Sequence, residues 1–267
     1  MKKEIITSTA NRRVKELVNL REARYRKQKK LFIIEGCREL QLALLSGINI
    51  AEIYFCPDLF GRSAEDEIIG LALRRKIPVF EVSKKVYSKI AFGSRQEGLI
   101  AVAREKKSSL SNVRLNGNAL IVVVEAIEKP GNLGAMLRTA DAAGVDAFIV
   151  ADPLTDIYNP NVVRSSLGTL FTTRVLEATS KEVISWLKAN KIKIICGCVG
   201  AKTPYASVDF RGPSAVVLGS EEKGLQSIWR DNADYQAAIP MKGKADSLNV
   251  SAAEAIFLFE ALRQRNS

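Results

Sequence analysis

Short apolar runs alternate with amphipathic stretches along the chain. The runs at 121–124, 147–151, 192–198, 215–218 and 236–239 have the length and composition of buried parallel strands. Between them, the stretches near 132–143, 160–168, 181–190 and 227–231 carry apolar residues at helical spacing. This alternation predicts an α/β domain whose parallel sheet is covered by helices on both faces.

The first hundred residues alternate in the same way on a smaller scale. Helical spacing predicts helices at 12–21, 38–46, 64–75 and 83–90, and apolar runs predict strands at 31–34, 53–56, 79–82 and 99–103. Such elements form a small α/β sandwich. A polar, turn-rich stretch follows and marks a linker. We therefore predict a domain at residues 1–106, a linker at 107–118 and a second domain at 119–267.

Composition narrows the class of protein. Apolar residues make up 47% of the 267 residues, and no apolar run reaches about 18 residues, so we expect real cores and no membrane span. The first residues are too polar to open a secretory signal, and the predicted location is cytoplasmic. The four cysteines form no CxxC pair and are interpreted as small buried residues rather than metal ligands.

The chain contains no histidine. This excludes Ser-His-Asp and Cys-His catalysis and the usual histidine metal sites, and we predict no metal. Enzymatic chemistry would have to use arginine, carboxylate, lysine or hydroxyl groups, or a bound cofactor. Methyl transfer from a sulfonium donor fits this limit, because the donor carries its own leaving group and the protein mainly positions the reactants.

The net charge of +11 is concentrated at one end of the chain. Residues 1–110 contain 23 basic and 13 acidic residues, whereas residues 111–267 contain 17 and 16. A basic footprint of this kind favours nucleic acid as a partner over a merely solubilising lysine surface. The side chains that we predict to contact RNA are Arg24, Arg26, Lys27, Lys29 and Lys30.

Polar side chains follow the first strand of the second predicted domain. Pro130 and Gly131 break the chain there, and Asn132 is predicted to cap the next helix. Arg138 lies about two turns into that helix. Because ligands of open α/β sheets bind at the carboxyl ends of the strands, Asn132 and Arg138 are candidate site residues. Taken alone, a helix cap and a solvated arginine explain them equally well.

A second glycine-rich turn follows the strand at 215–218. Gly219, Glu221 and Gly224 form a Gly-x-Glu-x-x-Gly pattern there. It lacks the Lys-Ser/Thr ending of a phosphate-binding loop, so a nucleotide-binding protein is disfavoured. Taken alone, the pattern is an ordinary strand–helix connection.

A third polar segment joins the last strand to the last helix. Ile-Pro-Met at 239–241 leads to Ser-Leu-Asn-Val-Ser at 247–251. Ser251 and Glu254 have the spacing of a capping box, so a helix is predicted to begin there. Asn249 would then lie where the backbone N–H groups of the helix N-terminus converge, although simple capping is again an alternative.

Together, the three segments resemble the signature motifs of the SpoU family, the RNA ribose 2′-O-methyltransferases of the SPOUT class. The resemblance covers about residues 119–265 and is specific because three separated motifs agree in order and spacing. The matching residues are Asn132, Gly134 and Arg138, then Gly219, Glu221 and Gly224, and finally residues 239–241 and 247–251. The first domain resembles, more loosely, the L30e-like substrate-binding module that precedes many members.

The resemblance implies a SPOUT-type parallel sheet with a C-terminal trefoil knot, preceded by a small L30e-like α/β domain. It implies S-adenosylmethionine as cofactor, a ribose 2′-hydroxyl of a structured RNA as acceptor, and a homodimer formed through the catalytic domain. The L30e-like domain favours ribosomal RNA of the 23S type. A transfer RNA enzyme, a base-methylating SPOUT enzyme and a non-catalytic RNA-binding protein of the same fold remain alternatives.

The resemblance also implies roles for individual residues. Arg138 would clamp the substrate phosphate and stabilise the developing alkoxide, because a guanidinium with a pKa above about 12 is a poor base. Asn132 would bind the ribose, and Glu221 would hold Arg138 or another substrate-facing group. Asn249 and Ser251 would complete this network. The cofactor would be held by Leu218, Gly219, Ile239, Met241 and Leu248.

Overall fold

The computed structural model describes residues 5–61, 63–93, 97–106, 108–115 and 117–267. Its contacts divide the chain into two compact units. The N-terminal unit comprises Met1–Lys106 and Asp156–Thr172, and the C-terminal unit comprises Lys107–Thr155 and Thr173–Ser267. Lys107 and Asn116 of the predicted linker lie outside the described residues, and the part between them contains the short 3-10 helix η2, Leu110–Asn112.

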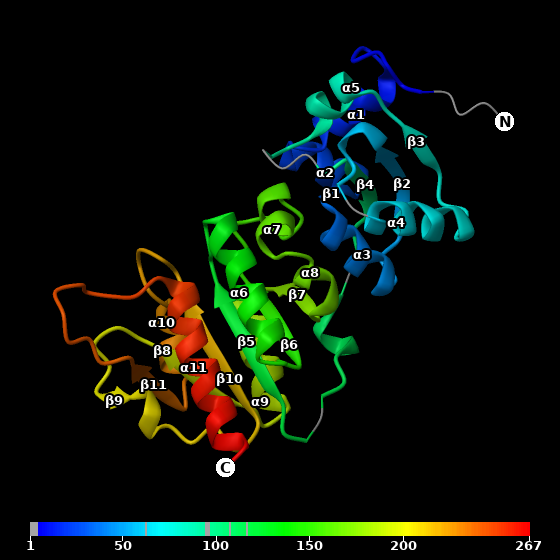
Figure 1. The fold of residues 1–267 in the computed structure, drawn as a ribbon. Coiled ribbons are helices and arrows are strands. Elements are labelled where there is room, and N and C mark those ends of the chain that lie inside the picture. Colours follow the sequence, from blue (N-terminus) through cyan, green and yellow to red (C-terminus); the bar gives the residue numbers. More distant parts are fainter. Residues whose placement is uncertain (1–4, 62, 94–96, 107, 116) are drawn as a thin grey trace. The chain divides into compact units, whose positions relative to one another are not determined.

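In the part of the chain that the structure describes, the C-terminal unit contains a seven-stranded parallel sheet (Figure 1). The order of its strands is β7-β6-β5-β10-β8-β11-β9. Five of the strands confirm the sequence prediction, and the short edge strands β7 and β9 are additional. The bounds are β5 Leu120–Glu125, β6 Ala147–Ala151, β7 Val175–Ala178, β8 Lys193–Gly197, β9 Thr203–Pro204, β10 Ser214–Gly219 and β11 Tyr235–Ala238.

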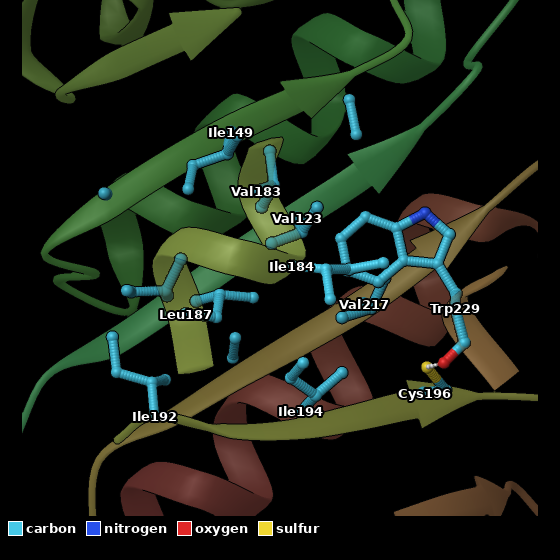
Figure 2. Packing of buried hydrophobic residues seen from close by; sticks show 14 of the residues in the cluster. Val123, Ile149, Val183, Ile184, Leu187, Ile192, Ile194, Cys196, Val217 and Trp229 are labelled. Atoms are coloured by element: carbon cyan, nitrogen blue, oxygen red, sulfur yellow. Dashed lines mark hydrogen bonds between the residues drawn. The ribbon is translucent and has the colours of Figure 1, made fainter. Parts of the chain in front are cut away.

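Helices cover both faces of this sheet, as the alternating pattern predicts. The helices α6 and α11 pack against each other, and α11 packs on β10 (Figure 1). On the opposite face, α9 and α10 cover the alternate strand residues that include Val123, Ile149 and Val217 (Figure 2). The helices of this unit are α6 Pro130–Ala142, α9 Ser180–Ala189, α10 Ser227–Asp231 and α11 Val250–Arg265, with the 3-10 helix η3 at Tyr205–Ser207.

The N-terminal unit is a small α/β sandwich, in agreement with the sequence pattern. Its described strands form a mixed sheet in the order β1-β4-β2-β3, with β4 antiparallel to both of its neighbours. The strands are β1 Leu31–Glu35, β2 Ile50–Phe55, β3 Val79–Glu81 and β4 Leu99–Arg104. The helices are α1 Arg12–Asn19, α2 Ala23–Lys29, α3 Cys37–Leu45, η1 Pro57–Leu59, α4 Ser63–Arg74 and α5 Lys84–Ile90.

A segment from later in the chain completes the N-terminal unit. Residues 156–172 carry α7, Pro160–Ser165, which packs on β1, and α8, Thr169–Thr172, which packs on α3. Phe32 of β1 is fully buried, with its ring centroid 4.3 Å from that of Tyr158 and 6.0 Å from that of Phe171. The helical pattern at 160–168 is thus confirmed in part, because α7 ends at Ser165, and its apolar face belongs to the N-terminal core.

The trefoil knot that the family resemblance implies stays a prediction. Among the described residues, no helix combines the length and the apolar character that crossing a bilayer requires.

Candidate active site

Three neighbouring strands of the C-terminal unit end at one cleft. Because β8, β10 and β11 are adjacent and parallel, their carboxyl ends lie at the same edge of the sheet. The residues that follow these ends line a cavity of about 360 Å³, and a larger cleft of about 720 Å³ adjoins it. This is the edge at which open α/β sheets bind their ligands.

The cavity is walled mainly by apolar side chains and by backbone. Leu218, Ile239, Met241 and Leu248 line it, and Gly219 lines the adjoining cleft. All five are residues that we predict to bind the cofactor, and that role stays a prediction. Met241 and Leu248 are more than one-third exposed, at 37% and 39%, so these two side chains remain accessible to a ligand.

One part of the cavity wall was not predicted from the sequence. Residues 197–201, which begin at the last residue of β8, line both the cavity and the cleft, and Phe257 of α11 also lines the cavity. The segment has few distinctive side chains, and its position directly after a buried strand was the available signal. The prediction that all four cysteines are buried holds for Cys56 and Cys196, whereas Cys198 of this segment and Cys37 are only half-buried.

Four of the five predicted catalytic residues form one hydrogen-bonded chain. Asn132 donates through Nδ2 to Glu221 Oε1, and Asn249 donates through Nδ2 to Asn132 Oδ1 over 3.2 Å. Asn249 Oδ1 in turn accepts from the Ser251 backbone N–H at 2.9 Å and from Ser251 Oγ at 2.7 Å. The first three line the cleft, and Ser251 supports Asn249 from within the helix. The three motifs therefore meet in one place and fix the orientation of both amides.

Glu221 has a second partner, which the sequence did not identify. Lys129, the residue before α6, has its Nζ 3.2 Å from Glu221 Oε2. The side chain of Lys129 is 74% exposed, whereas that of Glu221 is only 10% exposed. Glu221 therefore contacts the amide of Asn132 and the ammonium group of Lys129, and not Arg138.

Arg138 lies apart from this chain of residues. It is on α6, six residues beyond Asn132, which places the two side chains on different faces of the helix. Arg138 is exposed and is absent from the lining of the cleft, and its side chain has no hydrogen bond or ion pair with any residue that the structure describes. The C-terminal unit of one chain thus brings together the amides of Asn132 and Asn249 and the carboxylate of Glu221, but not the guanidinium of Arg138.

Two predicted helix caps are wrong. The residue before α6 is Lys129 and Pro130 opens the helix, so Asn132 lies inside its first turn, where its side chain is free to contact Glu221. At α11 the cap is Asn249, which accepts from the Ser251 N–H. Glu254, the expected capping-box partner, instead points into the protein. It is fully buried, and neither of its carboxylate oxygens has a hydrogen-bond partner among the described residues.

Replacing Glu254 by methionine is expected to stabilise the C-terminal unit at neutral pH by about 1–3 kcal/mol, the usual cost of an unsatisfied buried polar group. Burial raises the pKa of Glu254 well above its usual range. The folded state therefore holds a proton that the unfolded chain releases above its own pKa of about 4.3, and stability falls as the pH rises from there toward the folded pKa. The gain should accordingly be larger at pH 8 than at pH 5.

Denaturant unfolding followed by tryptophan fluorescence measures this effect, because Trp186 and Trp229 both lie in the C-terminal unit. Glu260→Met on the same helix is the control. Arg263 and Gln264 hydrogen-bond to Glu260 and lower its pKa to about 2, so its removal should not stabilise the unit. An equal or smaller gain for Glu254→Met at pH 8 than at pH 5 would contradict the prediction.

Of the five basic residues that we predict to contact RNA, four are exposed and one is buried. Arg24, Lys27, Lys29 and Lys30 are exposed on α2 and its C-terminal cap. Arg26 is 1% exposed, and its guanidinium donates to Asp156 Oδ2 at 2.8 and 2.6 Å and to the carbonyls of Leu20 and Arg21. The prediction for Arg26 is therefore wrong, because a buried, fully partnered guanidinium cannot reach an RNA phosphate.

Comparison with known proteins agrees with the arrangement of the site. A model of the SpoU rRNA Methylase family matches residues 119–259, which contain all three motifs. The chain belongs to the SpoU rRNA methylase family. A model of the MRM3-like substrate binding domain matches residues 11–101, in the N-terminal unit.

Individual SpoU relatives are similar over nearly the whole chain. A 23S rRNA (uridine(2479)-2'-O)-methyltransferase from Streptomyces viridochromogenes is 30% identical, over 88% of this chain and 84% of the relative. A crystal structure of an RNA 2'-O ribose methyltransferase is 40% identical, with a TM-score of 0.88 over 99% of this chain and 100% of the other. An AdoMet-bound rRNA methyltransferase from Sinorhizobium meliloti is 27% identical, with a TM-score of 0.89 over 97% of each chain. The predicted family and α/β fold class are confirmed.

Proposed function

We propose that this SpoU protein transfers a methyl group from S-adenosylmethionine to a ribose 2′-hydroxyl of ribosomal RNA. The observation that carries the proposal is the chain Ser251–Asn249–Asn132–Glu221, which brings the three motifs together at the edge where β8, β10 and β11 end. The relative named as a 23S rRNA 2′-O-methyltransferase supports ribose methylation of ribosomal RNA, and the structure named as an AdoMet-bound rRNA methyltransferase supports the cofactor and the same RNA class.

The cavity fits the proposed cofactor by its chemistry. It is apolar on its walls and bordered by backbone of three strand ends, which suits an adenosine held by stacking and main-chain hydrogen bonds. S-adenosylmethionine supplies, when bound, a methyl group on a positively charged sulfur. Leu218, Ile239, Met241 and Leu248 would hold it. Gly219 would close the cleft beside it.

The polar chain would orient the acceptor. Asn132 uses one amide hydrogen for Glu221 and one oxygen lone pair for Asn249, which leaves the other hydrogen and lone pair for a ribose hydroxyl. Glu221 prevents the amide from flipping. Lys129 is exposed at the mouth of the cleft and would contact a neighbouring phosphate. No group of this set is a strong base, so its main contribution is position and polarisation.

The proposed role of Arg138 requires a second subunit. Within one chain Arg138 does not line the cleft, so its guanidinium would have to serve the cleft of a partner. The surface of α11 supports a homodimer through the C-terminal unit, because apolar residues lie on several sides of this helix. Phe257 and Leu258 are buried, while Phe259 is 51% exposed and Ile256 is incompletely covered. A helix with apolar residues on several sides is expected to be covered on more than one of them, and a second subunit would supply the further cover.

The direct test is methylation of defined RNA. Purified protein, incubated with methyl donor and ribosomal or transfer RNA, should add one methyl group per molecule to ribosomal RNA, located on a ribose by mass analysis of the digested nucleosides. Cells that lack the gene should lose the same ribose methylation, and a cytoplasmic enzyme should be found with the ribosomal fraction. Base methylation, methylation of transfer RNA alone, or no turnover by folded protein would each reject the proposal.

Neutralising the exposed basic residues of α2 should weaken RNA binding without affecting chemistry. In the variant with alanine at Arg24, Lys27, Lys29 and Lys30, the slope of log affinity against log salt should become shallower. The change should be about 0.7–0.9 for each RNA phosphate that the variant no longer neutralises. Titrations at several salt concentrations measure this. Alanine at the exposed Lys181, Lys188 and Lys191 of the C-terminal unit is the control, and an equal change in that variant would refute a specific role for α2.

A further inference from the structure

A buried polar cluster lies at the carboxyl ends of β5 and β6, on the face of the sheet that α9 and α10 cover. It consists of Glu125 at the end of β5, Asp152 after β6, Ser180 at the start of α9 and Trp229 of α10, and we call it the Glu125 cluster. Glu125 is two residues beyond Val123 and so shares its face, toward α9 and α10. The indole of Trp229 lies on this face beside Val217 (Figure 2). None of these residues belongs to the proposed reaction.

The side chain of Glu125 holds the end of a functional loop. Its Oε2 accepts a hydrogen bond from the backbone N–H of Gln226 at 2.9 Å. Gln226 is the residue before α10 and closes the 219–226 loop, which carries Glu221. Glu125 is fully buried, whereas half of the residues of this loop are exposed, so one interior carboxyl group anchors a surface segment.

The backbone of Glu125 holds the start of the same loop. The parallel register pairs Glu125 with Gly219, where β10 ends. Gly219 has a φ of +156°, and a Cβ atom there would collide with the carbonyl oxygen of Glu125. Only glycine allows so close an approach. The two ends of the 219–226 loop therefore rest on one residue.

The number of hydrogen-bond donors around Glu125 bears on whether its carboxyl group is protonated. Ser180 Oγ lies 2.5 Å from Asp152 Oδ2 and 3.3 Å from Glu125 Oε1, and it accepts the indole N–H of Trp229 at 2.9 Å. A hydroxyl has one hydrogen, and the shorter contact assigns it to Asp152. Burial raises the pKa of Glu125. The neutral acid carries a hydrogen of its own, which it can donate to Ser180 Oγ. The titratable groups near it are Asp152 and the Cys196 thiol.

We propose that Glu125 is a positioning residue of this enzyme, which fixes both ends of the 219–226 loop and thereby sets Glu221 against Asn132. The proposal rests on the proposed function, since Glu221 matters only if the cleft performs methyl transfer. It also predicts that glutamine can replace Glu125. The amide oxygen would accept from Gln226, and the amide nitrogen would donate to Ser180, as the neutral acid does.

The test compares Glu125→Gln, Glu125→Ala and Glu125→Asp, with Asp152→Asn as the matched control. Asp152 belongs to the same cluster but does not contact the loop. Hydrogen exchange of the 219–226 amides, above all that of Gln226, reports the order of the loop whether or not the protein turns over. Single-turnover methylation reports positioning, and separate RNA and cofactor affinities report binding. Thermal unfolding identifies any variant that fails to fold. If Glu125→Ala does not fold, Glu125→Asp, which keeps the carboxyl group but shortens its reach, tests the proposal in its place.

Glu125→Ala and Glu125→Asp should speed exchange across the loop and slow methyl transfer by about 10–100-fold, as expected for a misplacement on the order of 1 Å, with RNA affinity unchanged. Glu125→Gln should keep both the slow exchange and the rate. Asp152→Asn should lower stability but leave the rate unchanged. Unaltered exchange in Glu125→Ala and Glu125→Asp, or an equal rate loss in Asp152→Asn, would overturn the proposal. A wild-type protein without methyl transfer but with the same exchange pattern would reject the proposed function and leave the anchoring intact.

Discussion

Replacing Arg138 by alanine is expected to slow methyl transfer by about 10²–10³-fold, or ~3–4 kcal/mol, while cofactor affinity stays the same. The reason is that Arg138 would stabilise charge that develops on the ribose oxygen only in the transition state. The cofactor cavity is built by residues after β8, β10 and β11, and Arg138 is not among them. Arg138→Lys should restore little, because an ammonium lacks the planar fork that binds a phosphate through two hydrogen bonds.

Single-turnover methylation of ribosomal RNA, together with calorimetric cofactor binding, measures both quantities. Arg211→Ala provides the control, since Arg211 is an exposed arginine of the same unit that pairs with Asp209 and does not line the cleft. Near-normal turnover of Arg138→Ala would show that the arginine has another task. Loss of cofactor binding in a folded variant would place it in the cavity instead.

Mixing two inactive variants tests whether the arginine acts across subunits. In a heterodimer of Arg138→Ala and Asn249→Ala, one cleft would combine an intact Asn249 with the intact Arg138 of the partner subunit. Activity should therefore return when the two proteins are mixed and allowed to exchange. If both groups acted within one chain, each cleft would lack one of them and the mixture would stay inactive.

Replacing Asp156 by alanine is expected to destabilise the N-terminal unit by about 3–5 kcal/mol. The partner, Arg26, is 1% exposed and would be left as a buried cation with only two backbone carbonyls. The side chain of Asp156 is 16% exposed, so the reverse variant, Arg26→Ala, leaves a carboxylate that water can partly reach and should cost less.

Hydrogen exchange of the β1 amides measures this free energy, because both tryptophans lie in the other unit and do not report it. Glu16→Ala is the control, since its ion pair with Arg12 is exposed and contributes little. Unchanged protection of β1 in Asp156→Ala would mean that the ion pair does not hold residues 156–172 in place.

The pattern of apolar residues was sufficient to predict most helices and strands, but it did not show which other parts of the chain they pack against. The strands at 121–124 and 215–218 were predicted because β-branched runs of that length are buried in any parallel sheet. The edge strands β7 and β9 were not, since Glu177 interrupts the apolar run of β7 and β9 has only two residues. The helical face at 160–168 was visible, but periodicity states only that a face is covered, not which unit covers it. Arg24 and Arg26 look alike in sequence because the partner of Arg26 is 130 residues away.

In the candidate site, too, some residues could be predicted from the sequence and others could not. Asn132, Glu221 and Asn249 were predicted because three separated motifs resemble those of the SpoU family in order and spacing, although each motif alone also fitted an ordinary helix cap or connection. The 197–201 segment was missed because it contributes backbone and small side chains, which carry no chemical signature. Glu254 was misassigned because capping-box spacing cannot distinguish a side chain that turns back to the helix end from one that turns into the core.

Residues 156–172 limit how this protein can be divided or recombined. A chimera that took residues 1–106 from a relative would seat a foreign β1 on the native Tyr158 and Phe171, and would separate Arg26 from its own Asp156. The N-terminal unit is thus discontinuous, with one piece on each side of the segment that carries Asn132 and Arg138. Substitutions in Phe32 or Arg26 should be inherited together with changes in the distant segment, so the two halves of the gene cannot drift independently.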